Sequence, residues 1–192
     1  MSRQHGETTT MKTLYIFLTR SGTLLSNLVY RLTGAQYTHI SLAFDEDLST
    51  LYSSTRKNGY TMFPAGPSRE YLNRGVFLMR ENIPCALYAL EVTDEAYIRA
   101  KRRTQHMMHH GELYRFNSLG LLLCWMHIRW QRRRHYFCSQ FVSEVLQKSG
   151  ALDLPKPSTL MHPSDYAELP QLRCLYRGTL ADLPQRQSME MG

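Results

Sequence analysis

Two features are scarce in this chain: cysteines close enough to pair, and apolar runs long enough to span a membrane. The 192 residues include four cysteines that lie far apart and form no CxxC pair. This spacing excludes a dense disulfide framework and favours reduced thiols. No segment reaches the ~18 consecutive apolar residues of a membrane-spanning helix, and no apolar stretch of a secretory signal follows residues 1–10. We therefore expect a cytoplasmic protein.

Acidic residues are scarce relative to basic ones. The chain has 16 Asp and Glu against 23 Lys and Arg, which gives a formal net charge of +7 and an isoelectric point near 9.4. This excess is compatible with nucleic acid, anionic lipid or an acidic wall polymer as a partner. Glycine (11) and proline (8) are too few for a fibrous chain, and 43% hydrophobic residues are too many for a disordered one. The length indicates one globular domain.

The pattern of apolar residues predicts a mixture of strands and helices. Strands are expected at residues 14–19, 37–44, 48–55, 76–79, 85–92 and 173–178, and helices at 23–32, 94–110 and 137–148. Residues 119–130 are apolar, but the pattern leaves their type open. Residues 58–75 and 154–163 are predicted to be loops because they are rich in turn-forming residues.

These elements do not alternate as βαβ units, which predicts an α+β fold with an antiparallel sheet packed against helices. We expect a flexible lead-in at residues 1–11, one domain at 12–182 and a flexible tail at 183–192.

Cys138 is predicted to open the helix at 137–148. A thiol in the first turn of a helix lies among unpaired backbone N–H groups at the positive end of the helix dipole. Those groups stabilise the thiolate, which is the nucleophilic form of cysteine. The same residue also lies at helical spacing from the apolar stripe of Phe141, Val142 and Val145, so a buried, inert cysteine is the alternative.

His39 and Ser53 are the candidate partners of this thiol. Alternation along residues 37–44 places His39 on a face of small side chains, away from the apolar face. A three-residue hairpin loop at 45–47 would pair Leu42 with Thr50 and place Ser53 opposite His39, where its hydroxyl could orient the imidazole. A four-residue loop would substitute Ser54. A hydrogen-bonded structural histidine is the other interpretation of His39.

The order of these motifs resembles the circularly permuted NlpC-type, papain-like cysteine hydrolases, in which histidine precedes cysteine. The likeness covers residues 14–180 and rests on YTHISLAF (37–44), LYSSTRKNG (51–59) and YFCSQFVSEVL (136–146), with PSDY (163–166) and LYRG (175–178) similar to the closing loop and final strand. It implies a permuted papain-like fold in which Cys138 is the nucleophile, His39 the base and Ser53 the best match to the third, orienting residue. Many relatives have a carboxylate, histidine or amide at that place, so serine is a departure.

The resemblance implies acyl transfer through a Cys138 thioester, on amide bonds of a peptide or peptidoglycan fragment. The alternatives are a lipid acyltransferase or thioesterase similar to lecithin:retinol acyltransferase, and a non-catalytic binding protein on the same fold. We expect no cofactor, no metal and no specific nucleic-acid partner. An anionic surface is a further possible partner, because Trp125 and Trp130 flank an apolar stretch next to a basic run that contains Arg129, Arg132, Arg133 and Arg134.

Overall fold

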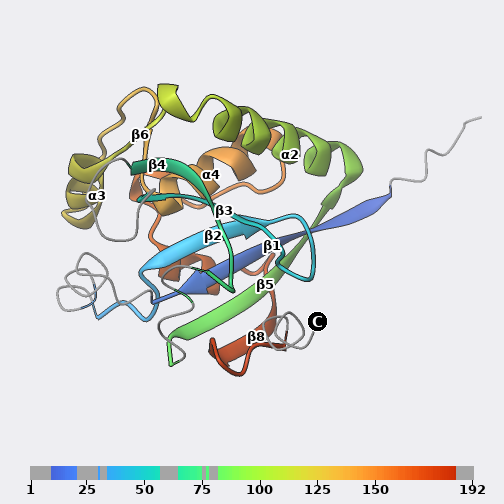
Figure 1. Ribbon diagram of the computed structural model, residues 1–192. Coiled ribbons are helices and arrows are strands. Elements are labelled where there is room, and N and C mark those ends of the chain that lie inside the picture. The colour runs from blue at the N-terminus through green and yellow to red at the C-terminus, as the bar shows by residue number, and fades with distance from the viewer. Residues whose placement is uncertain are drawn as a thin grey trace, which may run out of the picture.

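The computed structural model describes residues 10–20, 30, 34–56, 65–74, 77 and 82–184 (Figure 1). The helix predicted at 23–32 and the strand predicted at 76–79 lie outside the described residues, apart from single positions. The described chain has a mixed α+β fold whose six-stranded sheet is antiparallel throughout, as predicted. The strand order is β4-β3-β2-β1-β5-β8. These strands are β1 (Met11–Thr19), β2 (His39–Ala43), β3 (Leu51–Arg56), β4 (Ala65–Glu70), β5 (Pro84–Thr93) and β8 (Arg173–Thr179).

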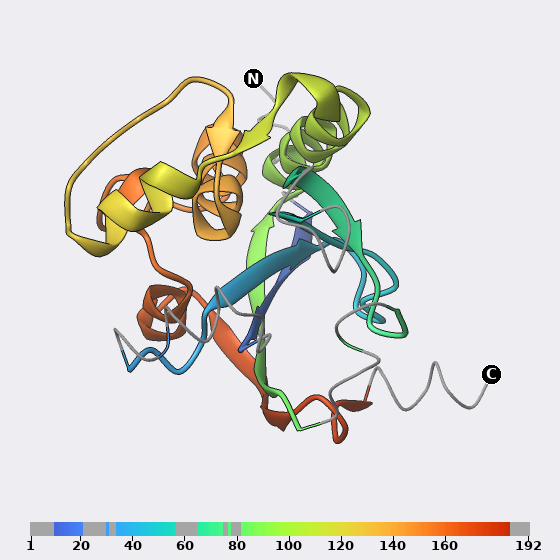
Figure 2. The same ribbon diagram turned by 60° about the vertical axis from the view of Figure 1, so that its left-hand side comes forward.

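Helices α2 (Asp94–His109) and α4 (Cys138–Ser149) pack side by side over one face of the sheet (Figures 1 and 2). The segment of undecided type forms α3 (Ser118–Trp125), and 3-10 turns lie at Gly111–Leu113, Ser158–Leu160 and Pro163–Glu168. A short parallel pair, β6 (Arg115–Phe116) and β7 (His135–Tyr136), joins the two sides of the segment that contains α3. Among the described helices, none is long and apolar enough to cross a membrane.

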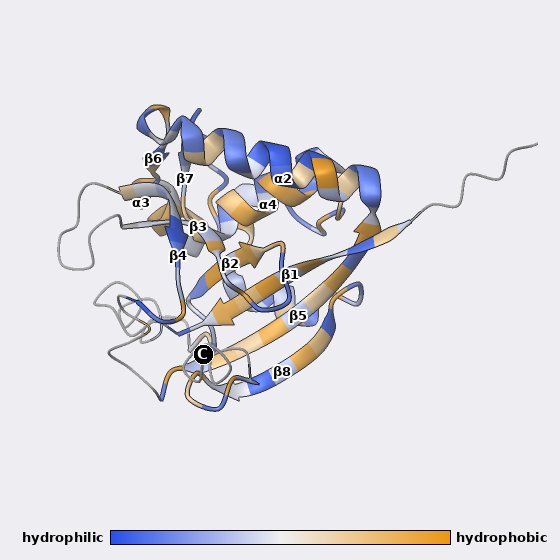
Figure 3. Cartoon of the chain, turned by 45° about the vertical axis from the view of Figure 1, so that its right-hand side comes forward, coloured by the Kyte–Doolittle hydropathy of each residue, from blue (hydrophilic) through white to orange (hydrophobic). Residues whose placement is uncertain are grey.

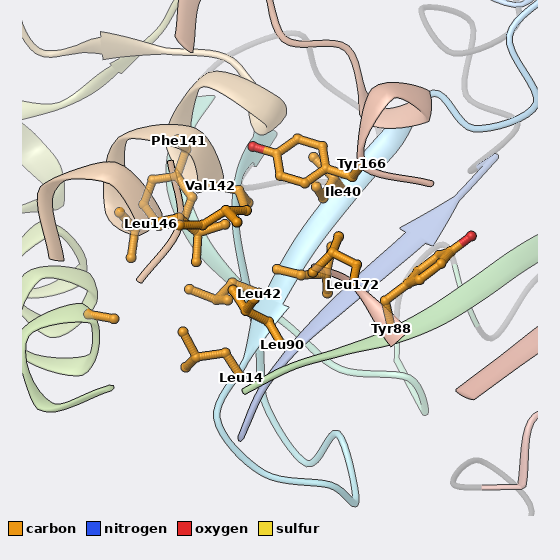
Figure 4. Close-up of a cluster of buried hydrophobic side chains, with 14 of the residues drawn as sticks. Leu14, Ile40, Leu42, Tyr88, Leu90, Phe141, Val142, Leu146, Tyr166 and Leu172 are labelled. Carbon is orange, nitrogen blue, oxygen red and sulfur yellow. The ribbon is translucent and has the colours of Figure 1, made fainter. Parts of the chain in front are cut away.

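Two apolar clusters form the core, one on each face of the sheet, because side chains alternate along the strands. The central strands β1 and β5 are accordingly largely apolar, whereas α2 is mostly hydrophilic (Figure 3). On the helical face, Leu14, Leu42 and Leu90 meet Phe141 and Leu146 of α4 (Figure 4). The opposite face buries a second group that includes Leu48, Phe77 and Leu183. Leu183 is fully buried, so the packed domain reaches one residue into the segment predicted to be a flexible tail.

Strand β4 corrects the prediction of a loop over residues 58–75. Its Gly66 and Pro67 are typical of loops, but β4 is the edge strand, where a proline interrupts no ladder on its outer side. Glycine is also required at position 66 for space, because a Cβ there would lie 2.9 Å from the backbone oxygen of Tyr114. Residues that suggested a turn therefore allow a strand to run close to neighbouring backbone.

The register between β2 and β3 also differs from the prediction. Leu42 pairs with Tyr52 rather than with Thr50, which is a shift of two residues. Leu48 was predicted to begin the second strand, yet it is fully buried in the second cluster with a left-handed φ of 54°. Because the burial of Leu48 lengthens the connection, β3 begins only at Leu51.

Candidate active site

His39 is the first residue of β2, and its imidazole is held by a carboxylate from β4. Its Nε2 lies 3.0 Å from both carboxylate oxygens of Glu70. The hydroxyl of Ser41 donates to Glu70 at 2.6 Å and lies 3.3 Å from the same nitrogen. The His39 and Glu70 side chains are only 11% and 14% exposed, so water screens their ion pair weakly. The ring is therefore fixed in orientation through its Nε2.

Cys138 is the first residue of α4, as predicted, and a hydrogen bond with its side chain is one of the causes that raise the pKa of the His39 ring. Because Glu70 and Ser41 occupy Nε2, Nδ1 is the ring nitrogen left for the thiol. Phe137, the residue before the helix, provides no side-chain cap. The first turn of α4, which contains Cys138, therefore lacks a side-chain cap from Phe137, and its unpaired N–H groups favour negative charge nearby.

The surroundings of His39 raise its proton affinity. Burial alone would lower the pKa of the ring, but the negative charge of Glu70 and the hydrogen bonds to Cys138 and Glu70 outweigh it. The pKa of His39 is thus well above its ordinary value of 6.5. Burial would likewise raise the pKa of Glu70, but its attraction to His39 and its hydrogen bonds to His39 and Ser41 lower it. Glu70 therefore stabilises the positive charge that the His39 ring carries once it has taken up a proton.

Ser53 is not brought to His39. It is fully buried, and its hydroxyl donates to the backbone oxygen of Ile40 at 2.8 Å. The predicted position opposite His39 followed from the predicted register, which is shifted by two residues in the structure. Ser54, the substitute in the longer loop, donates to the backbone oxygen of Tyr136 at 2.7 Å. The Ser53 hydroxyl thus links β3 to β2, and the Ser54 hydroxyl links β3 to β7. The orienting partner of the ring is Glu70.

Glu70 was missed because its segment reads as a loop. One signal in the sequence could have found it. Glu70 is the sole acidic residue between Asp47 and Glu81, and so the sole carboxylate on the stretch that follows the strand of His39.

A second cysteine and histidine lie in contact elsewhere. Cys124 Sγ is 3.7 Å from His162 Nε2. Burial raises the pKa of Cys124 to about 12, and burial also lowers the pKa of His162, so both groups are neutral near pH 7. Burial raises the pKa of the Cys85 thiol to about 12 as well. Within the described ranges, no group of three or more His, Cys, Asp or Glu side chains is arranged to hold a metal ion.

Comparisons of this chain with protein-family models, with curated proteins and with solved structures find no match.

Proposed function

We propose that this chain is a cysteine-dependent hydrolase of permuted papain-like fold that cleaves amide bonds of a peptide or peptidoglycan fragment. The observation that supports it best is the row Cys138–His39–Glu70, with a thiol at a helix N-terminus, an imidazole beside it and a carboxylate on the far nitrogen. Nucleophile, base and orienting group are the three parts that covalent acyl transfer requires. The order of His39 before Cys138 supports the permuted form of the fold.

In the proposed reaction, the His39 imidazole takes the thiol proton and the Cys138 sulfur attacks the carbonyl carbon. The carbonyl oxygen becomes an oxyanion, for which the backbone N–H of Cys138 is a donor at the start of α4. The C–N bond then breaks, and the leaving amine takes the proton from His39. Water attacks the resulting thioester, gives a proton to His39, and releases the acid and the thiol. Glu70 acts through His39, as a positioning residue that stabilises the imidazolium.

A lipid acyltransferase or thioesterase is the second candidate. The chemistry at Cys138 would be the same, but the acyl group would come from an ester of an amphiphile. An exposed apolar face on α3, close in the fold to the first turn of α4, favours this candidate.

The test is to trap the acyl-enzyme. The protein would be incubated with p-nitrophenyl acetate, and the four cysteine peptides would be mapped by mass spectrometry. We expect one acetyl group on Cys138, none on Cys124, and little acetylation in a His39→Ala variant. The Cys124→Ala variant is the matched control and should be acetylated like the wild type. Absence of an acetyl group on Cys138 of the folded wild type would contradict the proposal and favour a binding protein.

Substrate class would be decided with the same variants. Peptidyl coumarin amides and p-nitrophenyl esters of rising chain length would be compared by kcat/KM. Preference for the amides supports the hydrolase of peptides, whereas a rate that rises steadily with acyl chain length supports the lipid enzyme.

A further inference from the structure

Helix α3 exposes an apolar stripe to solvent. Leu119, Leu122 and Met126 follow at steps of three and four residues along the helix and its C-cap, so they lie on one face, and they are 52%, 52% and 59% exposed. The opposite face packs inward through Gly120 and Cys124, which are buried. A helix that is apolar all round is normally buried on all sides. One side of α3 is thus left without a partner within the described residues.

The segment that contains α3 is held in place at both ends. The backbone N–H of Arg115 donates to the oxygen of Arg134 at 2.9 Å, which closes the segment at its base. The Asn117 amide accepts from the Gly120 N–H at 3.0 Å and donates to Gln140 of α4 at 3.1 Å. A Cβ at Gly120 would lie 2.1 Å from the Asn117 amide nitrogen, so the glycine allows this cap. The stripe is therefore presented by a fixed element, tied two residues from Cys138.

Basic side chains follow the stripe directly. No acidic residue occurs between Glu112 and Glu144. The loop from α3 to β7 extends away from the body of the molecule (Figure 2). The loop contains four exposed arginines, Arg129, Arg132, Arg133 and Arg134. Their guanidinium groups form no ion pair or hydrogen bond with the part of the chain that the structure describes.

We propose that this surface docks on an anionic lipid membrane. The α3 surface is defined by Leu119, Leu122, Met126 and Ile128 together with the four arginines. Aliphatic side chains insert at the boundary between headgroups and acyl chains, and arginines pair with anionic headgroups around them. Nucleic acid would use the charge but not the leucine and methionine stripe, since bases stack on aromatic rings. The charge thus points to an anionic partner, and the stripe points to lipid.

The exposure of side chains favours different anchor residues from those that the sequence suggested. The sequence pointed to Trp125 and Trp130 as the residues that flank the apolar stretch, but both are only half-exposed. Leu122 and Met126 are the more exposed side chains. We therefore expect these two residues, rather than the tryptophans, to enter the lipid boundary.

Flotation with vesicles tests the docking surface. The full chain would be mixed with vesicles of phosphatidylcholine alone, or with a quarter of the lipid replaced by phosphatidylglycerol. We expect binding to the anionic vesicles, and weaker or no binding to the neutral ones. The double variant Leu122→Asn, Met126→Gln should bind anionic vesicles about tenfold more weakly or worse, because the inserted apolar area is lost. The matched control is Ile98→Asn, a comparably exposed apolar residue on α2 (39%).

Charge is tested separately from apolar contact. A triple variant tests the charge: Arg129→Gln, Arg132→Gln and Arg133→Gln together. It should bind anionic vesicles on the order of 10²-fold more weakly, and added salt should reduce the difference from the wild type. The control removes the same charge from exposed residues elsewhere, by Arg102→Gln, Lys148→Gln and Arg173→Gln. Equal losses in the two triple variants would show that net charge alone binds, and would overturn the proposal.

Other occupants of the α3 surface give different results. A dimer in sedimentation velocity that the Leu122 and Met126 variant abolishes would assign the surface to a second copy of the chain. Binding to a single-stranded oligonucleotide without binding to anionic vesicles would assign it to nucleic acid. Either result overturns membrane docking. Docking does not depend on the proposed catalysis: Cys138→Ser should bind vesicles like the wild type, so failure of one proposal leaves the other standing.

Discussion

Cys138 and Cys124 each lie beside a histidine, but at opposite ends of their helices. Cys138 is the first residue of α4, where backbone N–H groups favour a negative sulfur. Cys124 is next to the last residue of α3, where backbone carbonyl groups disfavour it. The exposed fraction of the residue differs as well: it is 8% for Cys138 and 1% for Cys124. The same two side-chain types are thus placed in opposite electrostatic environments.

The two histidines also differ in how a nearby carboxylate contacts them, and this difference again favours the site of Cys138. Glu70 holds the His39 ring directly, with both oxygens 3.0 Å from Nε2. Asp165 instead accepts the His162 backbone N–H at 2.5 Å and pairs with Lys156 at 2.7 Å. Burial and Lys156 lower the pKa of His162 more than Asp165 raises it. The proposed function therefore assigns reactivity to Cys138 rather than to Cys124 because of two features: a carboxylate on the histidine ring and a helix N-terminus at the sulfur.

Removing each sulfur in turn should give the largest contrast. Cys138→Ala should reduce hydrolysis of p-nitrophenyl acetate on the order of 10³-fold or more, because the nucleophile is lost. Cys124→Ala should leave the rate within about twofold and only lower stability, by about 1 kcal/mol for one small buried side chain. Steady-state kinetics and urea unfolding of both variants check this. Equal activity of the two variants would contradict the assignment.

Removing each carboxylate should give the next largest contrast. Glu70→Gln should reduce kcat/KM on the order of 10²- to 10⁴-fold, because the imidazole loses its orienting and charge-stabilising partner. Burial then lowers the pKa of His39 against the interactions with Cys138 alone. Because the base must be unprotonated to accept the thiol proton, the acid limb of the pH–rate profile should move to lower pH. Asp165→Asn should leave the profile unmoved. A Glu70→Gln variant with reduced rate but an unchanged profile would mean that Glu70 has only a structural role.

The His39–Glu70 pair should also make stability depend on pH. The pKa of Glu70 is lowered in the folded protein, so Glu70 stabilises the fold above pH 4.5, and this stabilisation is lost as the pH falls through the lowered pKa. The pKa of His39 is raised in the folded protein, so His39 stabilises the fold below pH 6.5, and this stabilisation is lost as the pH rises through the raised pKa. The difference in unfolding free energy between wild type and Glu70→Gln should therefore be largest between pH 4.5 and 6.5. Urea titrations across this range measure it, and a difference independent of pH would refute the ion pair.

The smallest expected effect concerns Ser53. Ser53→Ala removes the hydrogen bond to the Ile40 oxygen and should cost about 1 kcal/mol of stability. The pH–rate profile and kcat should stay unchanged, since the hydroxyl does not contact His39. A loss of activity comparable to that of Glu70→Gln would restore Ser53 as the third residue of the site.

Much of the fold could be predicted because local patterns determine it. The α4 helix at Cys138–Ser149 and strands β1, β2 and β5 lie close to their predicted bounds, since their apolar periodicity matches the faces they bury. The register of β2 and β3 could not be predicted, because Leu48 leaves the strand pattern to fill a distant cluster. Strand β4 could not be predicted either, because an edge position tolerates the glycine and proline that indicate a loop.

The candidate site was predictable to the same extent. Cys138 and His39 follow from motif, order and local structure, and the structure places them close enough for Cys138 to raise the pKa of His39. Glu70 depends on a strand that local propensity does not reveal, and its approach to His39 is a tertiary contact across 31 residues. The orienting partner of the base is thus the part of the site that required the fold.

The most direct test is the rate of iodoacetamide alkylation of each cysteine in the native protein as a function of pH, followed by peptide mapping. We predict that Cys138 reacts rapidly below about pH 7, under the usual titration of a free thiol, while Cys124 and Cys85 react only after unfolding. In His39→Ala the fast reaction at low pH should disappear. A Cys138 as slow as Cys124 across the whole range, in a protein shown to be folded, would contradict an activated thiol and the hydrolase proposal.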